Sequence, residues 1–290
     1  MNLNNWWYNI SFIGRSQGFR VTRHTINLDA THDMNFNDFK TPEQFKELCG
    51  YEIDGFWYPR VTKIVEIKAK PALYRFYAKM QNFAEGERIK KQSATEGTLI
   101  HETVEGLLLS KKPEIPSSIA PSIKAFMEFV LEKNIQVDQA YIEHRLVNYE
   151  ERYAGTLDAV AMIDGKVGIL DIKTSQAIYR DYDLQTSAYL AAMKDIVPGL
   201  ETRWILRIDQ SRSCMHCGAI LRSKGGKDQI KIRWDNPFMR ACKNHEWGEL
   251  EGRIELKEFP DWQHDFQAFL GAKKLWEWEN VDWLKKVGYV

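Results

Sequence analysis

The sequence predicts an α/β protein of the α+β type, in which a mixed β-sheet is flanked by helices. Two apolar, β-branched runs, residues 154–163 and 166–173, are separated by Asp164 and Gly165, a pair typical of a tight hairpin turn. Residues 178–194 have the apolar spacing of a helix. A later strand, residues 202–209, is separated from its expected partner at 251–259 by an insertion of about forty residues.

The elements on either side of the hairpin follow from their local patterns. Apolar residues recur every three to four positions in the expected helices, and the expected strands are apolar or alternating runs bounded by turn residues. In chain order we expect strands at 7–13 and 19–28, helices at 42–48, from Pro71, at 98–109 and at 122–133, a first core strand at 139–149, and an aromatic helix at 261–283. The chain then divides into an N-terminal extension of unknown role, residues 1–55, and a core, residues 56–290, with an insertion at 210–250.

The hairpin carries charges among apolar neighbours. With a two-residue turn, the register places Asp158 opposite Asp171 and Thr156 opposite Lys173. Side chains alternate faces along a strand, so both aspartates and the lysine project to one side. Like charges directly opposite destabilise a sheet, and a shared Mg²⁺ or Mn²⁺ ion relieves that repulsion. The alternative is a solvated pair of aspartates with the lysine as a surface counter-ion.

Two predicted helices bring further polar side chains toward this hairpin. Gln185 and Tyr189 are four residues apart in the helix after it, so they share one face. His101 lies on the core-facing stripe of the helix at 98–109, where a lone histidine is usually a satisfied boundary residue.

Four segments together resemble, in order and spacing, the motifs of the RecB-like branch of the PD-(D/E)xK nucleases. They are EGTLIH at 96–101, GTLD at 155–158, DIK at 171–173 and QTSAY at 185–189, and the resemblance extends over about residues 58–277. Leu157 stands where the superfamily name has proline, which members of this branch often lack.

The resemblance implies a restriction-endonuclease-like fold and a metal-dependent deoxyribonuclease. The relatives that the chain most resembles are exonucleases that hydrolyse DNA at ends or in single strands during recombination, repair or phage replication. Such an enzyme would have a helicase, recombinase or single-strand-binding protein as partner. It implies Mg²⁺ or Mn²⁺ ligands at Asp158, Asp171, the Ile172 carbonyl and His101, with Glu143 as a further candidate, and catalytic roles for Lys173, Gln185 and Tyr189. Two alternatives remain: a CRISPR-adaptation-type iron–sulfur nuclease, and a catalytically weak DNA-binding scaffold.

The insertion contains a second candidate metal site. Cys214, Cys217, Cys242 and His245 have the order of a tetrahedral Zn²⁺ site, which would stabilise a small insertion. Some RecB-like relatives instead hold a [4Fe–4S] cluster on four cysteines, and Cys49 would supply the fourth here. The third possibility is that the cysteines are free thiols, and sequence spacing does not decide among the three possibilities.

The loop at 222–227 is expected to be an exposed basic tip. Arg222, Lys224 and Lys227 are candidates for contacts to a DNA backbone, and the alternative is a solubilising turn.

Bulk composition limits the class of protein. The chain of 290 residues has 40 basic and 40 acidic residues, so its overall charge does not indicate a nucleic-acid binder, although a local groove with metal ions can bind phosphates. No apolar run approaches the about 18 to 20 residues of a membrane span, and no signal-peptide pattern is present. We therefore expect a cytoplasmic protein, in a bacterial or phage-infected cell, without disulfides or membrane contact.

Overall fold

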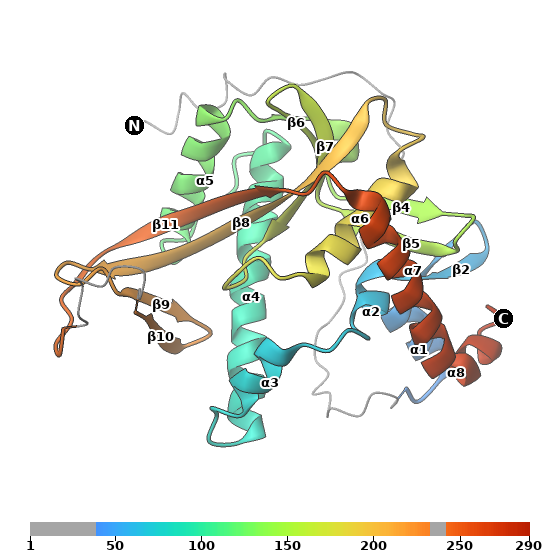
Figure 1. The fold of residues 1–290 in the computed structure, drawn as a ribbon, viewed down its shortest axis with the longest axis horizontal. Helices are drawn as coiled ribbons and strands as arrows, with labels where there is room; N and C mark the ends of the chain where they lie inside the picture. Colours follow the sequence, from blue (N-terminus) through green and yellow to red (C-terminus); the bar gives the residue numbers. More distant parts are fainter. Residues whose placement is uncertain (1–38, 233–241) are drawn as a thin grey trace.

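The computed structural model of the chain describes residues 39–232 and 242–290 (Figure 1). The helices are α1 (Pro42–Cys49), α2 (Val61–Val65), α3 (Pro71–Tyr77), α4 (Phe83–Leu108), α5 (Ala120–Glu132), α6 (Asp181–Met193), α7 (Trp262–Glu279) and α8 (Val281–Lys286). The strands are β1 (Gly50–Ile53), β2 (Phe56–Pro59), β3 (Gln136–Val137), β4 (His144–Asn148), β5 (Tyr153–Leu157), β6 (Ala159–Ile163), β7 (Lys166–Lys173), β8 (Leu200–Cys214), β9 (Ile220–Lys224), β10 (Lys227–Lys231) and β11 (Trp247–Glu258).

The main sheet is mixed, as the sequence predicts. Its strands follow the order β10-β9-β8-β7-β6-β3, and β11 pairs with the other edge of β8. β7 and β8 are parallel, with α6 in the connection between them, and the other pairs are antiparallel. Parallel neighbours need such a crossover connection, and this explains why a helix follows the predicted hairpin directly.

Helices cover both faces of the sheet (Figure 1). Leu170 and Ile172 of β7 belong to one core with α4 and α5, whereas Ile169 belongs to a second core with α1, α2, α6 and α7. This alternation explains why β7 is almost continuously apolar, because a strand covered on both faces buries every side chain. Asp171 is therefore a charged residue in an otherwise apolar strand.

The hairpin register is confirmed near the turn and interrupted farther from it. Ile163 pairs with Lys166 and Ala159 with Leu170, as a two-residue turn requires. The ladder ends there, because Asp158 is a bend between β5 and β6. The expected pairing of Thr156 with Lys173 is therefore wrong, and β5 pairs with β4 in a separate two-stranded sheet.

The segment before β5 also differs from the expected core strand at 139–149. Gln139–Tyr141 forms a short 3-10 turn, and only His144–Asn148 is extended. Between them, Glu143 has a left-handed backbone with φ of 50°, which breaks the strand. Glu143 therefore lies in a turn next to the sheet, where its N–H donates to the Asp158 carbonyl at 2.9 Å.

The helices agree with the sequence in position and differ in length. α6 lies within the expected range of 178–194, and α5 and α7 lie close to theirs. The helix expected from Pro71 ends at Tyr77, and the helix expected at 98–109 is the second half of α4, which begins at Phe83. Asn82 caps α4, its side chain accepting from the Glu85 N–H at 2.8 Å, and this cap lies far upstream of the apolar stripe.

The described part of the N-terminal extension packs into the main body. Phe45 and Cys49 of α1 are buried in the same core as α7 and α8, and Phe45 stacks on Trp283 with ring centroids 5.8 Å apart. The strands expected at 7–13 and 19–28 lie outside the described residues. None of the helices formed by the described residues is long and apolar enough to cross a membrane.

Candidate active site and metal centre

The candidate active site lies where β6 breaks away from β7. The pairing of β6 with β7 ends at Ala159 and Leu170, so the described part of β6 offers no partner to Ile172. The Ile172 N–H donates instead to the Asp158 carboxylate, at 2.5 Å. A buried backbone N–H must be satisfied, so the break fixes the position of the carboxylate. The other edge of Ile172 stays paired with β8.

Asp171 is completely buried beside this break. Its Oδ1 atom accepts from Gln185 Nε2 at 3.1 Å, and the Lys173 ammonium lies 2.6 Å from Oδ2. That ion-pair contact lacks hydrogen-bond geometry, so Oδ2 has no aligned donor within the described part of the chain. A buried carboxylate oxygen with no aligned donor is suited to bind a cation.

The pKa values of both carboxyl groups are raised. Burial raises the pKa of Asp171 to about 6, the Lys173 ammonium opposes this shift, and the Asp158 carboxylate adds to it. Burial also raises the pKa of Asp158, against the opposing effects of Lys173 and the Ile172 N–H. Two carboxylates in one desolvated site repel each other, and a divalent ion would remove that repulsion.

Gln185 and Tyr189 reach the site from α6. Gln185 Nε2 donates both to Asp171 and to the Tyr189 hydroxyl, the latter at 3.0 Å. The described hydrogen bonds of the glutamine thus orient the aspartate, and none of them joins it to Lys173. The Tyr189 ring lies across β5 at Gly155, where an added Cβ would be 2.6 Å from Cε1. The close approach of this ring explains why the GTLD segment has a glycine at position 155.

His101 reaches the site from α4. The helix approaches the end of β7 closely, because a Cβ on Gly97 would lie 2.7 Å from the Thr174 Oγ1 atom. One turn later, burial lowers the pKa of His101 to about 4, with Lys173 acting in the same direction and Asp171 and the Ile172 backbone opposing. The imidazole is therefore neutral at physiological pH, which is the form that binds metals.

Tyr182 is a member of the site that sequence reasoning missed. The Lys173 ammonium lies 5.1 Å from the centre of the Tyr182 ring, so the lysine is held between a carboxylate and an aromatic face. Tyr182 stands at the start of α6, three residues before the Gln185 segment. Its spacing from Gln185 places both on one helix face, which is the signal that could have identified it.

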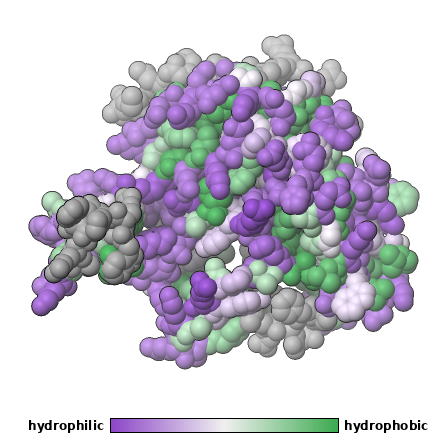
Figure 2. Space-filling model, viewed as in Figure 1, coloured by the Kyte–Doolittle hydropathy of each residue, from purple (hydrophilic) through white to green (hydrophobic). Residues whose placement is uncertain are grey.

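Two adjoining cavities open on the site. The larger, of about 1100 Å³, is lined by His101, Asp158 and acidic residues that include Glu143. The smaller, of about 330 Å³, is lined by Lys173 and by basic residues of β9, and both cavities share His101 and Thr174. Hydrophilic residues cover most of the face shown in Figure 2, which is hollowed near its centre. The result is a polar groove whose larger cavity has more carboxylates than lysines, the latter being Lys111 and Lys112, and whose smaller cavity is basic.

The basic loop of the insertion is docked, contrary to the expected exposed tip. Arg222 binds Asp209 at 2.7 Å and donates to the Thr174 carbonyl at 3.3 Å, and the Lys224 ammonium donates to the same carbonyl. Lys227 contacts the Met80 sulfur at 3.2 Å. Backbone contacts explain the docking, because Thr174 at the end of β7 offers a carbonyl that these cations satisfy.

Lys224 lacks a carboxylate partner within the described residues, in contrast to Arg222. Burial lowers the pKa of its ammonium to about 8, with Arg222 acting in the same direction and Asp209 and Glu96 opposing. A half-buried ammonium that lines a cavity and bonds a neutral carbonyl is suited to bind an anion as well.

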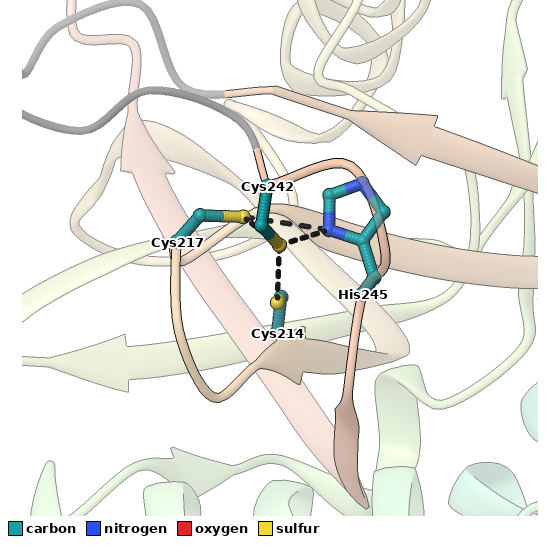
Figure 3. Close-up of side chains that lie close together, drawn as sticks. All are labelled: Cys214, Cys217, Cys242 and His245. Carbon is teal, nitrogen blue, oxygen red and sulfur yellow. Dashed lines mark hydrogen bonds between the residues drawn. The ribbon is translucent and has the colours of Figure 1, made fainter.

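The four candidate ligands in the insertion come together (Figure 3). Their ligand atoms lie within 4.8 Å of one another, in an arrangement that can hold a metal ion. Cys242 Sγ lies 3.6 Å from Cys214 Sγ and 3.5 Å from Cys217 Sγ, and 3.2 Å from His245 Nδ1. Although burial opposes ionisation, nearby N–H groups lower the pKa of Cys214 to about 5, which favours the thiolate that metals bind.

Cys49 is not part of this cluster. It is buried in the core of α1, α2 and α7, where desolvation raises its pKa to about 12. Cys214 and Cys217 instead form a small separate cluster with Ala219. The structure therefore brings together three cysteines and a histidine, and not the four cysteines expected for the iron–sulfur alternative.

No family model matches the chain, and no curated protein matches it. Among solved structures, the protein SSO0001 aligns with a TM-score of 0.31 and 16% sequence identity, over 74% of this chain and 75% of SSO0001. At this TM-score the likeness does not establish a shared fold.

Proposed function

We propose that the protein is a metal-dependent DNA nuclease with a restriction-endonuclease-like core of the RecB-like branch. The observation that carries the proposal is the meeting of Asp158, Asp171, Lys173 and His101 at a break in the sheet. Placing a fully buried carboxylate and a half-buried one beside a lysine is unfavourable for stability alone, so a constellation of this kind favours a functional role.

Asp158, Asp171, the Ile172 carbonyl and His101 would hold one or two Mg²⁺ or Mn²⁺ ions. A bound ion would supply Lewis acidity, lowering the pKa of a water nucleophile and stabilising charge on the phosphate. Lys173, released from Asp171 when a cation takes its place, would orient the water or neutralise the phosphate. Gln185 keeps Asp171 in position through its 3.1 Å hydrogen bond.

The groove supports a nucleic-acid substrate. The phosphodiester would lie between the acidic cavity and the basic one, where Arg222 and Lys224 can contact the neighbouring backbone phosphate. We propose DNA as the substrate and an exonuclease mode, acting on ends or single strands, as the resemblance of the four motifs implies.

We propose Zn²⁺ as the ion of the Cys/His cluster. With a Zn–S bond of about 2.3 Å, the edges of a tetrahedral ligand set are about 3.8 Å long. The sulfur–sulfur distances of 3.5 and 3.6 Å are close to that edge. Three thiolates and one imidazole are also a common structural zinc set.

The test is cleavage of end-labelled linear and circular DNA, single- and double-stranded, with Mg²⁺, with Mn²⁺ and without a divalent ion. We expect metal-dependent loss of linear DNA, abolished in Asp171→Asn and Lys173→Ala. Lys166→Ala is the matched control, because Lys166 stands on the same strand at the turn and pairs with exposed Glu258. Equal cleavage by the wild type and both site variants would refute the proposal, and cleavage of circles would refute the exonuclease mode.

A further inference from the structure

The Cys/His cluster lies at the base of the hairpin that carries Arg222 and Lys224. Cys214 ends β8 and Cys217 precedes β9, whereas Cys242 and His245 follow β10. A metal ion bound by all four residues would therefore link the two ends of the segment that contains the hairpin. Among the described residues, the apolar cluster at that base is small and consists of the three cysteines with Ala219 and Trp247, so a bound metal ion would add to its stability.

The cluster also fixes the register that positions the two basic residues. The Cys214 N–H donates to the Ala219 carbonyl at 2.7 Å, and the Gly218 N–H donates to the Cys214 carbonyl at 3.1 Å. These bonds close the turn from β8 to β9, in which Arg212 pairs with Leu221. A one-residue slip would move Arg222 to the other face of β9, away from Asp209 and Thr174.

The tip of the hairpin is docked on α4 by polar contacts. The Gly225 N–H donates to the Glu96 carboxylate at 3.1 and 3.2 Å. Gly225 has φ of +64°, and a Cβ there would collide with Ser93 and Ile89. Gln176 and Gln229 form a further bond between the hairpin and the segment after β7. The hairpin makes these polar contacts in the register that its base sets.

We infer that the metal ion of the Cys/His cluster belongs to the substrate-binding apparatus. By fixing the base of the β9–β10 hairpin, it sets Arg222 and Lys224 at the edge of the candidate active site, where they bind the phosphate next to the one that is cleaved. This inference rests on the proposed nuclease function for the identity of the anion. Loss of the ion then weakens binding of nucleic acid and leaves the carboxylate centre able to bind Mn²⁺.

The experiment compares His245→Ala with His245→Cys, which retains a metal ligand, in the full-length protein. His216→Ala is the matched control, because His216 lies in the same loop and pairs with exposed Glu246 without joining the cluster. Metal content is measured by plasma emission spectrometry, hairpin docking by amide hydrogen exchange of residues 220–231, and Mn²⁺ binding by calorimetry. Binding of a fluorescein-labelled single-stranded oligothymidylate is measured by anisotropy with Ca²⁺.

We expect His245→Ala to lose the resident metal, to exchange faster over residues 220–231 and to bind the oligonucleotide about ten-fold more weakly, with Mn²⁺ binding unchanged. His245→Cys and His216→Ala should resemble the wild type. Unchanged exchange and affinity after metal loss would overturn the inference, as would a wild type that contains no metal. If the wild type cut DNA while His245→Ala bound it normally, the inference would fail and the nuclease proposal would stand.

A second variant covers the case in which His245→Ala does not fold. Glu96→Ala removes the acceptor of the Gly225 N–H on α4 and leaves every cluster ligand in place. It should keep its metal and weaken oligonucleotide binding in the same direction. Normal binding by a Glu96→Ala variant whose hairpin exchanges faster would contradict the role given to the docked hairpin.

Discussion

The Lys173 ammonium lies 2.6 Å from the Oδ2 atom of Asp171, two residues away on β7. Residues two apart on a strand project to the same side, so the strand geometry itself creates this pair. In the absence of a divalent ion the lysine partly neutralises a carboxylate that is completely buried. Under the proposed function, a metal ion at this carboxylate would compete with the lysine for it.

Asp158→Asn should separate metal binding from stability. An asparagine Oδ1 can still accept the Ile172 N–H, and removing one of two repelling carboxylates should leave the metal-free variant at least as stable as the wild type. At a Mn²⁺ concentration of about 100 times Kd, the wild type should gain about 2.7 kcal/mol, and the variant should gain little. Urea unfolding with and without Mn²⁺ measures both quantities.

Asp164→Asn provides the control for that experiment. Asp164 is in the turn of the same hairpin with φ of 51°, a conformation that asparagine tolerates. It should respond to Mn²⁺ like the wild type. A full Mn²⁺ response in Asp158→Asn would show that this carboxylate is not a ligand.

Gly97→Ala should impair the site more than the fold. The added methyl group would lie 2.7 Å from Thr174 Oγ1, so Thr174 or α4 must shift. We expect α4 to move and to carry His101 with it. A misplacement approaching 1 Å can lower the rate by up to about 100-fold, whereas overpacking costs about 1 to 3 kcal/mol. Cleavage kinetics measure the change in rate, and urea unfolding measures the change in stability.

The contrasting variant is Gly271→Ala in α7, where, apart from the local helix backbone, no atom of the described residues lies within 4 Å of an added Cβ. Replacing a helical glycine by alanine should stabilise the protein by roughly 0.5 to 1 kcal/mol without changing the rate. Equal kinetics for the two alanine variants would contradict the tight approach of α4 to Thr174.

DNA affinity should fall as the pH rises through about 8, because the Lys224 ammonium, whose pKa is lowered to about 8, then loses its proton. The protonated form binds phosphate, so the effect is present below that pKa and disappears above it. Lys224→Arg should remove this pH dependence, since a guanidinium remains charged. Anisotropy titrations from pH 6.5 to 9.5 measure the effect, and an identical profile in Lys224→Arg would assign the titration to another group.

Arg203 should be the most sensitive charged residue for stability. It is 1% exposed, donates to the Asp183 carbonyl at 2.7 Å and to the Phe259 carbonyl at 3.1 Å, and pairs with Asp265. Arg203→Ala leaves these partners buried and unsatisfied, which should cost about 3 to 5 kcal/mol. The Arg180 side chain lies beside Asp183 and Asp265 but is 74% exposed. Arg180→Ala should therefore change the free energy of unfolding by less than about 0.5 kcal/mol. Thermal unfolding of both variants decides between these values.

Local patterns predicted the parts of the fold that local forces determine. The turn at Asp164 and Gly165 set the register of β6 and β7, and the apolar period located α6. The long pairing of β8 with β11 across the insertion also matches the expected strands. In each case the hydrophobic pattern extends over enough residues to distinguish a helix from a strand.

The differences arise where tertiary contacts override the pattern. Residues 154–163 have the pattern of one strand, but the strand is interrupted at Asp158, whose carboxylate accepts the Ile172 N–H. The tip at 222–227 reads as solvated, but the Thr174 carbonyl and Glu96 hold it. Neither partner is close in sequence, so no local signal could have indicated the contact.

β7 is an interior strand, paired with β6 through Leu170 and with β8 as far as Lys173. A backbone in that position opens only when much of the sheet opens, so Asp171 keeps its place for nearly the lifetime of the folded molecule. The β9–β10 hairpin comes from outside the strand and contributes one wall of the groove. Substitutions in this hairpin can therefore reshape the groove without moving the carboxylate.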